Sequence, residues 1–120
     1  MIKAGTCVRS NHAPRHIYVV LNDPRSPDGA IVLVNFTTYD AKRHGKETLF
    51  SPADYLHLTH ESVLAFWKSL PRATGPKLEQ AIAAGDFTAM PEIPRPTLER
   101  MIAAGRASRH LSPEQKRLLA

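Results

Sequence analysis

The chain lacks the features that mark secreted, disulfide-bonded and membrane proteins. It contains one cysteine, Cys7, which excludes an internal disulfide framework and makes the cytoplasm the expected compartment. Its longest apolar runs, such as residues 31–34, are far too short to cross a bilayer, and the first residues contain no apolar segment of a secretory signal. We therefore expect a cytoplasmic protein without a membrane partner.

Several motifs of cofactor and metal chemistry are also missing. There is no phosphate-binding Gly-x-x-x-x-Gly-Lys loop, no Gly-x-Gly-x-x-Gly, no Cys-x-x-Cys and no Gly-x-Ser-x-Gly. His57 and His60 would share a face of a helix and point to opposite faces of a strand, but no acidic or cysteine partner stands at a diagnostic spacing. We therefore expect neither a cofactor nor a metal site.

The composition that remains is that of one folded domain. Of the 120 residues, 42% are hydrophobic and 22% are charged, which distinguishes the chain from a disordered one. Sixteen Lys and Arg residues against 11 Asp and Glu give a net charge of +5. This excess favours an acidic partner such as nucleic acid, although a surface charge that only aids solubility remains an alternative.

The first half of the sequence reads as β-structure. Residues 16–21 and 30–38 are rich in β-branched and apolar residues, and the turn-forming stretch 22–29 between them predicts an antiparallel pair. Residues 5–9 and 47–50 are candidates for further short strands. For residues 56–67 we favour short strands, with a helix from Thr59 as the open alternative, because short apolar runs fit both.

The composition changes after Leu70, and helical signals dominate from there. Residues 77–84 are followed by Gly85, residues 97–105 end in Gly105, and Ser112 with Gln115 has the pattern of a helix-capping box. We predict a mainly β (α+β) protein with a β unit at 1–70 and a short helical tail at 71–120. The tail is expected to pack on the β unit or on a partner through its apolar positions, namely Leu78, Ile82, Leu98, Met101 and Ile102.

The loop before the strand 16–21 concentrates chemically versatile groups. Asn11, His12, Arg15 and His16 combine an amide, two imidazoles and a guanidinium. Imidazole exchanges protons near neutral pH, and guanidinium binds phosphate through two parallel hydrogen bonds. These are the groups that RNA cleavage without a metal requires, whereas the alternative is an ordinary polar surface loop.

The pattern of the first 70 residues resembles the PemK/MazF-like toxin superfamily. The resemblance lies in residues 5–8, in a polar loop that ends in a basic residue before the strand 17–21, in residues 31–34 leading to Thr37 and Thr38, and in Ser62-Val63. Small bacterial relatives of that superfamily carry an Asp-His-Pro-Phe-Ile-x-His-x-Ser-like motif. Asp54, His60 and Ser62 stand at matching positions, while Tyr55 replaces the first histidine of that motif.

The resemblance implies an SH3-like antiparallel barrel, a homodimer, and a metal-independent endoribonuclease that acts as a toxin beside an antitoxin. Arg15 matches the basic residue before the second strand, Thr38 the hydroxyl after the third, and His60 the second histidine of the relatives. With His16 from the same loop, these four residues are the predicted catalytic groups. The predicted RNA contacts are Arg9, Asn11, His12, Lys42, Arg43 and Ser62.

Two departures from the toxin pattern keep other functions open. The toxins carry an acidic segment after Ser-Val, and here Phe66-Trp67 stands near that place; their Arg-Pro pair is replaced by Arg15-His16. A non-catalytic SH3-like module that binds nucleic acid or protein is therefore the second hypothesis. A regulator or immunity protein whose helical tail docks another chain is the third.

Overall fold

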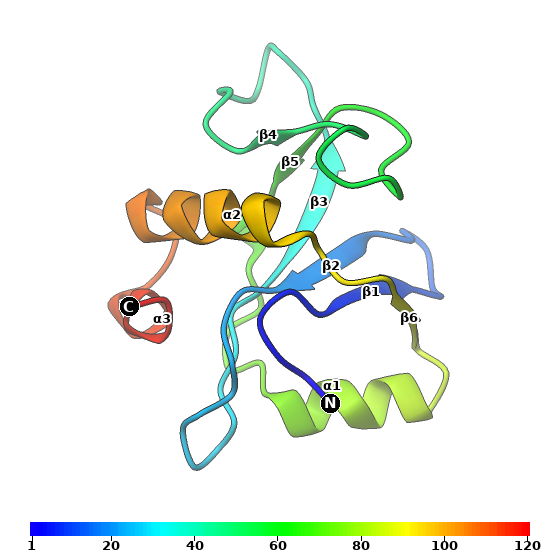
Figure 1. Ribbon diagram of the computed structural model, residues 1–120, viewed down its shortest axis with the longest axis vertical. Helices are drawn as coiled ribbons and strands as arrows, with labels where there is room; N and C mark the ends of the chain where they lie inside the picture. The colour runs from blue at the N-terminus through cyan, green and yellow to red at the C-terminus, as the bar shows by residue number, and fades with distance from the viewer.

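Six antiparallel strands and three α-helices make up the computed structural model, which describes residues 1–120 (Figure 1). The strand order is β4-β5-β3-β2-β1-β6. Strands β4 and β6 are the two edges, so the sheet is not closed into a barrel. The predicted α+β class with an antiparallel sheet is confirmed. The strands are β1 (Cys7–Ser10), β2 (Ile17–Val20), β3 (Leu33–Thr38), β4 (Leu49–Phe50), β5 (Ser62–Leu64) and β6 (Phe87–Met90).

Strand β3 connects the two parts of the sheet. Its first half pairs with β2, where Val34 lies opposite Val19. Its second half pairs with β5, where Thr38 lies opposite Ser62. Because each half has a different neighbour, the strand carries its C-terminal residues away from β2 and toward the β4–β5 side of the molecule.

Both faces of the central strands are buried. Cys7, Val19 and Val34 belong to a core that includes Leu98 and Met101, whereas the alternate residues of these strands belong to a second core with Leu78. Successive side chains of a strand point to opposite faces, so burial on both sides requires apolar residues in sequence. This explains why the strands read as continuous apolar runs.

The helices begin and end where their capping residues stand. They are α1 (Gly75–Ala83), α2 (Arg95–Ala107) and α3 (Pro113–Leu118), with a short 3-10 helix η1 at Phe66–Lys68. The Thr74 hydroxyl accepts from the Lys77 N–H at the start of α1, and Gly85 follows that helix with a φ of 84°. The predicted capping box of Ser112 and Gln115 is confirmed at α3.

Helix α2 differs from its prediction at Gly105. The sequence predicts a helix end there, but α2 continues to Ala107. A Cβ at Gly105 would lie 2.7 Å from Leu119 Cδ1 and 3.4 Å from Phe66 Cε1. Glycine at this position therefore allows close approach of neighbouring segments rather than a left-handed turn.

The C-terminal half is part of the same fold as the first half. Strand β6, which the sequence did not predict, pairs with β1 along its whole length, with Cys7 opposite Met90. Leu78, Leu98 and Met101 are buried, and Ile82 and Ile102 are partly buried, all against the sheet. Of the two arrangements that the sequence left open, packing on the β unit or on a partner, the structure shows these side chains against the β unit. None of the helices is long and apolar enough to span a membrane.

We expect Met101→Ala to lower the free energy of unfolding by about 2–5 kcal/mol, because it removes a side chain that is fully buried between α2 and the sheet. Denaturant unfolding, followed by circular dichroism and by Trp67 fluorescence, should show one shared transition at a lower midpoint. The exposed neighbour Glu99→Ala is the control, with an expected change within about 0.5 kcal/mol. Two separate transitions would contradict a common core.

Candidate active site

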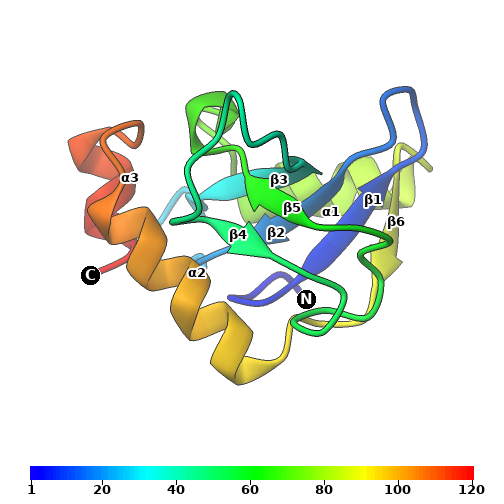
Figure 2. The same cartoon turned by 90° about the horizontal axis from the view of Figure 1, so that it is seen from above.

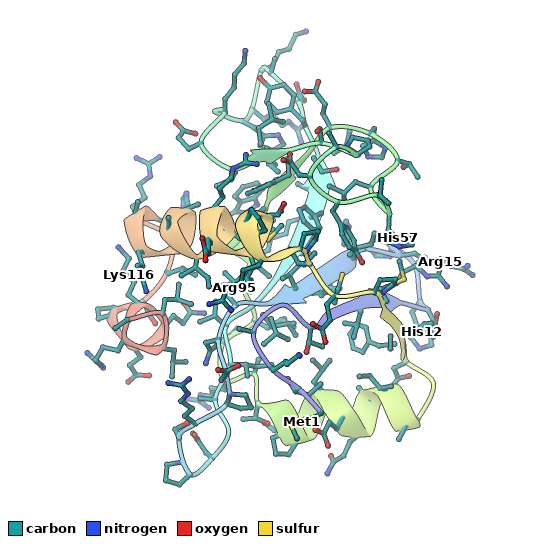
Figure 3. The ribbon with its side chains drawn as sticks, viewed as in Figure 1. Met1, His12, Arg15, His57, Arg95 and Lys116 are labelled. Carbon is teal, nitrogen blue, oxygen red and sulfur yellow. The ribbon has the colours of Figure 1, made fainter.

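A pocket of about 440 Å³ lies where the β1–β2 loop, the end of β3 and the β4–β5 loop meet. Arg15 and His57, which come from two of these segments, lie at the same side of the molecule in Figure 3. The strands supply the floor, and the two loops supply most of the polar groups. The lining residues are Arg9, Arg15, His16, Ile17, Phe36, Thr37, Thr38, His57, Leu58, Thr59, His60, Ser62 and Met90.

The floor of the pocket follows from the alternation of the strands. Arg9 lies two residues beyond the buried Cys7 on β1, and Thr38 lies two residues beyond the buried Phe36 on β3. Residues two apart share a face, so these polar side chains continue the face on which the core packs. Apolar residues thus end and polar ones begin along the same face, and the pocket forms at that boundary.

His60 is held in place by hydroxyl groups on both ring nitrogens. Its Nε2 lies 2.9 Å from Thr38 Oγ1, and its Nδ1 lies 3.0 Å from Thr59 Oγ1. The pairing of Thr38 with Ser62 brings the β5 side of the chain to this place, and the Ser62 hydroxyl donates to the His60 carbonyl at 3.2 Å. In the neutral imidazole one nitrogen donates and the other accepts, so the two threonine hydroxyls take opposite roles.

Two further imidazoles in the pocket have no hydrogen-bond partner within the chain. The rings of His16 and Tyr18 are arranged edge to face, with their centroids 6.4 Å apart. The centroids of the His57 and Tyr55 rings lie 5.2 Å apart. Aromatic neighbours orient both rings while leaving their nitrogens available to a ligand.

The β4–β5 loop is fastened to the C-terminal half by hydrogen bonds. The Tyr55 hydroxyl donates to the Pro91 carbonyl at 2.6 Å, and the Thr97 hydroxyl donates to the Asp54 carbonyl at 2.9 Å. Arg100 donates to the Asp54 carboxylate at 2.6 Å. These bonds fix the loop that carries His57 and His60, so the helical segment positions the pocket without lining it.

Burial and hydrogen bonds shift the pKa values of three ionisable groups at or beneath this loop. Burial raises the pKa of Asp54, but the Ser51 N–H and Arg100 outweigh it and hold the pKa below its usual value. Burial raises the pKa of Tyr55, which keeps its hydroxyl protonated and able to donate. Burial also raises the pKa of Cys7 to about 11, so this thiol is not a nucleophile at neutral pH.

The charges of the pocket are all of one sign. Its lining contains two guanidinium groups, those of Arg9 and Arg15, three imidazoles and no carboxylate. With no internal counter-charge, the site attracts an anion. Guanidinium and imidazole N–H groups together match the oxygens of a phosphate.

The structure brings together all four predicted catalytic residues, Arg15, His16, Thr38 and His60, with two of the predicted RNA contacts, Arg9 and Ser62. The other four predicted contacts lie outside this pocket. The Asn11 amide donates to the Gly85 carbonyl, and His12 pairs with Asp86 at 2.9 Å. Lys42 and Arg43 lie on the β3–β4 loop, where Arg43 borders a different hollow.

His57 is the pocket residue that the sequence did not assign a function. Its only signal was its spacing of three residues from His60, whose meaning depends on the local backbone. A loop here brings both imidazoles to one pocket. No group of three or more His, Cys, Asp or Glu side chains is placed to hold a metal ion.

Comparison with protein-family models, with curated proteins and with solved structures finds no match to the chain.

The Asp54–Arg100 contact predicts a defined pH dependence of stability. Because the pKa of Asp54 is lower in the folded than in the unfolded chain, its contribution is fully present above the usual aspartate pKa of about 4 and is lost as the pH falls through the folded value. Asp54→Asn should therefore lower the free energy of unfolding by about 1 kcal/mol at pH 7 and by less at pH 3. Urea denaturation at both pH values measures this; an equal loss at both would contradict the assignment.

Proposed function

We propose that the protein is a metal-independent endoribonuclease that cleaves single-stranded RNA in this pocket. The observation that carries the proposal is the convergence of two guanidinium and three imidazole groups in one hollow without a carboxylate. RNA cleavage through the 2′-hydroxyl needs a base, an acid and a cationic group for the phosphorane, and these side chains supply all three.

In the proposed reaction the 2′-oxygen of RNA attacks the neighbouring phosphorus, and the bond from phosphorus to the 5′-oxygen breaks. The substrate 2′-hydroxyl replaces Thr38 Oγ1 as the hydrogen-bond partner of His60 Nε2, which accepts the 2′-hydroxyl proton while the Nδ1–H donates to Thr59 Oγ1. A protonated His16 gives its proton to the departing 5′-oxygen. Arg9 and Arg15 bind the phosphate oxygens and stabilise the charge that develops on them. The products are a 2′,3′-cyclic phosphate and a free 5′-hydroxyl.

The wider toxin assignment rests on the resemblance of residues 4–70 to the PemK/MazF-like superfamily. Strand β3, which pairs with β2 in its first half and with β5 in its second, supports an SH3-like arrangement of these strands. Action as a toxin, neutralisation by an antitoxin, a homodimeric state and a cytoplasmic location remain predictions from the sequence.

A non-catalytic module that binds nucleic acid is the second candidate. The observation that favours it is the occupation of both His60 ring nitrogens by threonine hydroxyls, which suits a structural role as well as a catalytic one. In that case the cationic pocket would bind RNA, and His60 would only shape it.

The test is cleavage of a labelled single-stranded RNA by the purified protein in EDTA. His60→Gln retains a side chain that can hydrogen-bond to Thr38 but removes the proton acceptor, so we expect at least about a 10²-fold lower rate. Arg15→Ala should lower the rate similarly by removing a phosphate contact. Arg25→Ala, a change at an exposed arginine paired with Asp23, is the matched control and should leave the rate unchanged.

Binding measured on the same variants separates the two candidates. RNA that binds to the wild-type protein and is never cut would support the non-catalytic module. Wild-type cleavage that His60→Gln and Arg15→Ala leave intact would contradict the assignment of the reaction to this pocket.

A further inference from the structure

The surface next to the pocket carries a group of aromatic rings that the proposed reaction does not use. The rings of His44 and Trp67 are stacked, with their centroids 5.3 Å apart and their planes at an angle of 23°. The ring of His110 lies edge-on to Trp67, with the two centroids 6.2 Å apart. The centroids of the Tyr39 and His44 rings lie 6.4 Å apart. Trp67 is 44% exposed, whereas the neighbouring Phe66 is buried.

Three of these rings, those of His44, Trp67 and His110, line a groove formed by three segments distant in the sequence: the β3–β4 loop, η1, and the loop between α2 and α3. Figure 2 shows the β3–β4 loop and the α2–α3 loop at the same side of the molecule. Two adjoining hollows of about 540 and 610 Å³ share Arg43, His44, Trp67 and His110. We call these hollows together the aromatic groove.

The aromatic groove is continuous with the candidate active site. Thr37 and Thr38 line both the pocket that contains His60 and the hollow that contains Trp67. A chain bound with a phosphate in the pocket would therefore pass the end of β3 to reach the indole ring.

The charged groups of the groove favour an anionic chain. Arg43, Lys68 and Arg109 line it, together with the carboxylates of Asp40 and Glu47. Asp40 lies 3.8 Å from Arg43, whereas Lys68 and Arg109 form no ion pair within the chain. Two unpaired cations beside an exposed indole are the combination with which proteins bind single-stranded nucleic acid, by stacking on the bases and by attraction to the phosphates.

We propose that the aromatic groove is a second binding subsite, in which Trp67 stacks on a base of the RNA strand that extends from the active-site pocket. Lys68 and Arg109 contact the phosphates on either side of that base. This inference rests on the proposed function in naming RNA as the occupant. It adds a requirement for substrate length and single-strandedness, because a paired base cannot offer its face to the indole.

Trp67 is the only tryptophan in the chain, so its fluorescence reports on the groove alone. The probe is a single-stranded uridine decamer with 2′-O-methyl groups, which can bind but has no 2′-hydroxyl to react. We expect the decamer to quench Trp67 saturably and the same decamer annealed to its complement to quench it much less. Binding without any change in fluorescence would overturn the proposal.

Variants measured by anisotropy of the labelled decamer extend the test. Trp67→Ala should bind about 5- to 100-fold more weakly, with Trp67→Phe between it and the wild type. Leu70→Ala changes an exposed apolar residue outside the groove lining and should bind as the wild type does. Equal affinity of Trp67→Ala and wild type would contradict stacking at this site.

Lys68→Ala and Arg109→Ala test the phosphate contacts of the groove, and they provide a result even if Trp67→Ala does not fold. Each should reduce the slope of log affinity against log salt by about 0.7, the amount for one phosphate contact on a single strand. Arg25→Ala removes one positive charge elsewhere and should leave the slope unchanged. Unchanged slopes in both groove variants would overturn the phosphate contacts.

Failure of this inference and failure of the ribonuclease proposal give different results. Cleavage is measured on the unmodified uridine decamer, which has the 2′-hydroxyl groups, and quenching is measured on the 2′-O-methyl decamer, which cannot be cut. Quenching without cleavage would retain the groove and overturn the nuclease. Cleavage without quenching would retain the nuclease and leave a protein as the alternative occupant of the groove.

Discussion

The pairing of Thr38 with Ser62 is the constraint on which the rest of the site depends. This antiparallel contact places His60 against the end of β3, where its Nε2 lies 2.9 Å from Thr38 Oγ1. The other half of β3 pairs with β2, which begins at Ile17 immediately after Arg15 and His16. One strand therefore brings two loops, separated by about forty residues of sequence, to the same pocket.

The C-terminal half contributes support rather than reactive groups. Arg100 and Thr97 of α2 hold Asp54, and Pro91 accepts from Tyr55, so the β4–β5 loop is bonded to a helix that is itself buried against the sheet. The reaction that we propose would depend on such support, because small displacements of acid and base groups lower the rate of a reaction steeply. The C-terminal half also adds a strand to the sheet, because β6 pairs with β1.

Much of the fold can be predicted from the sequence because local sequence signals and tertiary packing favour the same elements. The apolar runs of β2 and β3, the turn between them, and the capping residues of α1 and α3 all predicted the correct element. Strand β6 was missed because Phe87–Met90 is short and partly exposed, and only its pairing with β1 makes it a strand. The end of α2 was misplaced because Gly105 serves the contact with Leu119, which no local pattern reveals.

The candidate site was predictable in part for the same reason. Residue chemistry and the family resemblance predict four site residues, and all four line one pocket: Arg15, His16, Thr38 and His60. His57 was not assigned, because its spacing from His60 has different meanings in a helix, a strand and a loop. Asn11 and His12 are close to Arg15 in sequence, yet their side chains turn toward residues 85 and 86.

The most direct test of the account is a titration followed by the NMR signals of the imidazole rings. The ligand is a dinucleotide with a 2′-deoxy sugar, which fills the pocket and cannot be cleaved. The account predicts that the ring protons of His16, His57 and His60 shift together along one saturation curve, while those of His12 and His110 remain in place. Shifts confined to other histidines, or separate curves for His16 and His60, would contradict a single phosphate site formed by these residues.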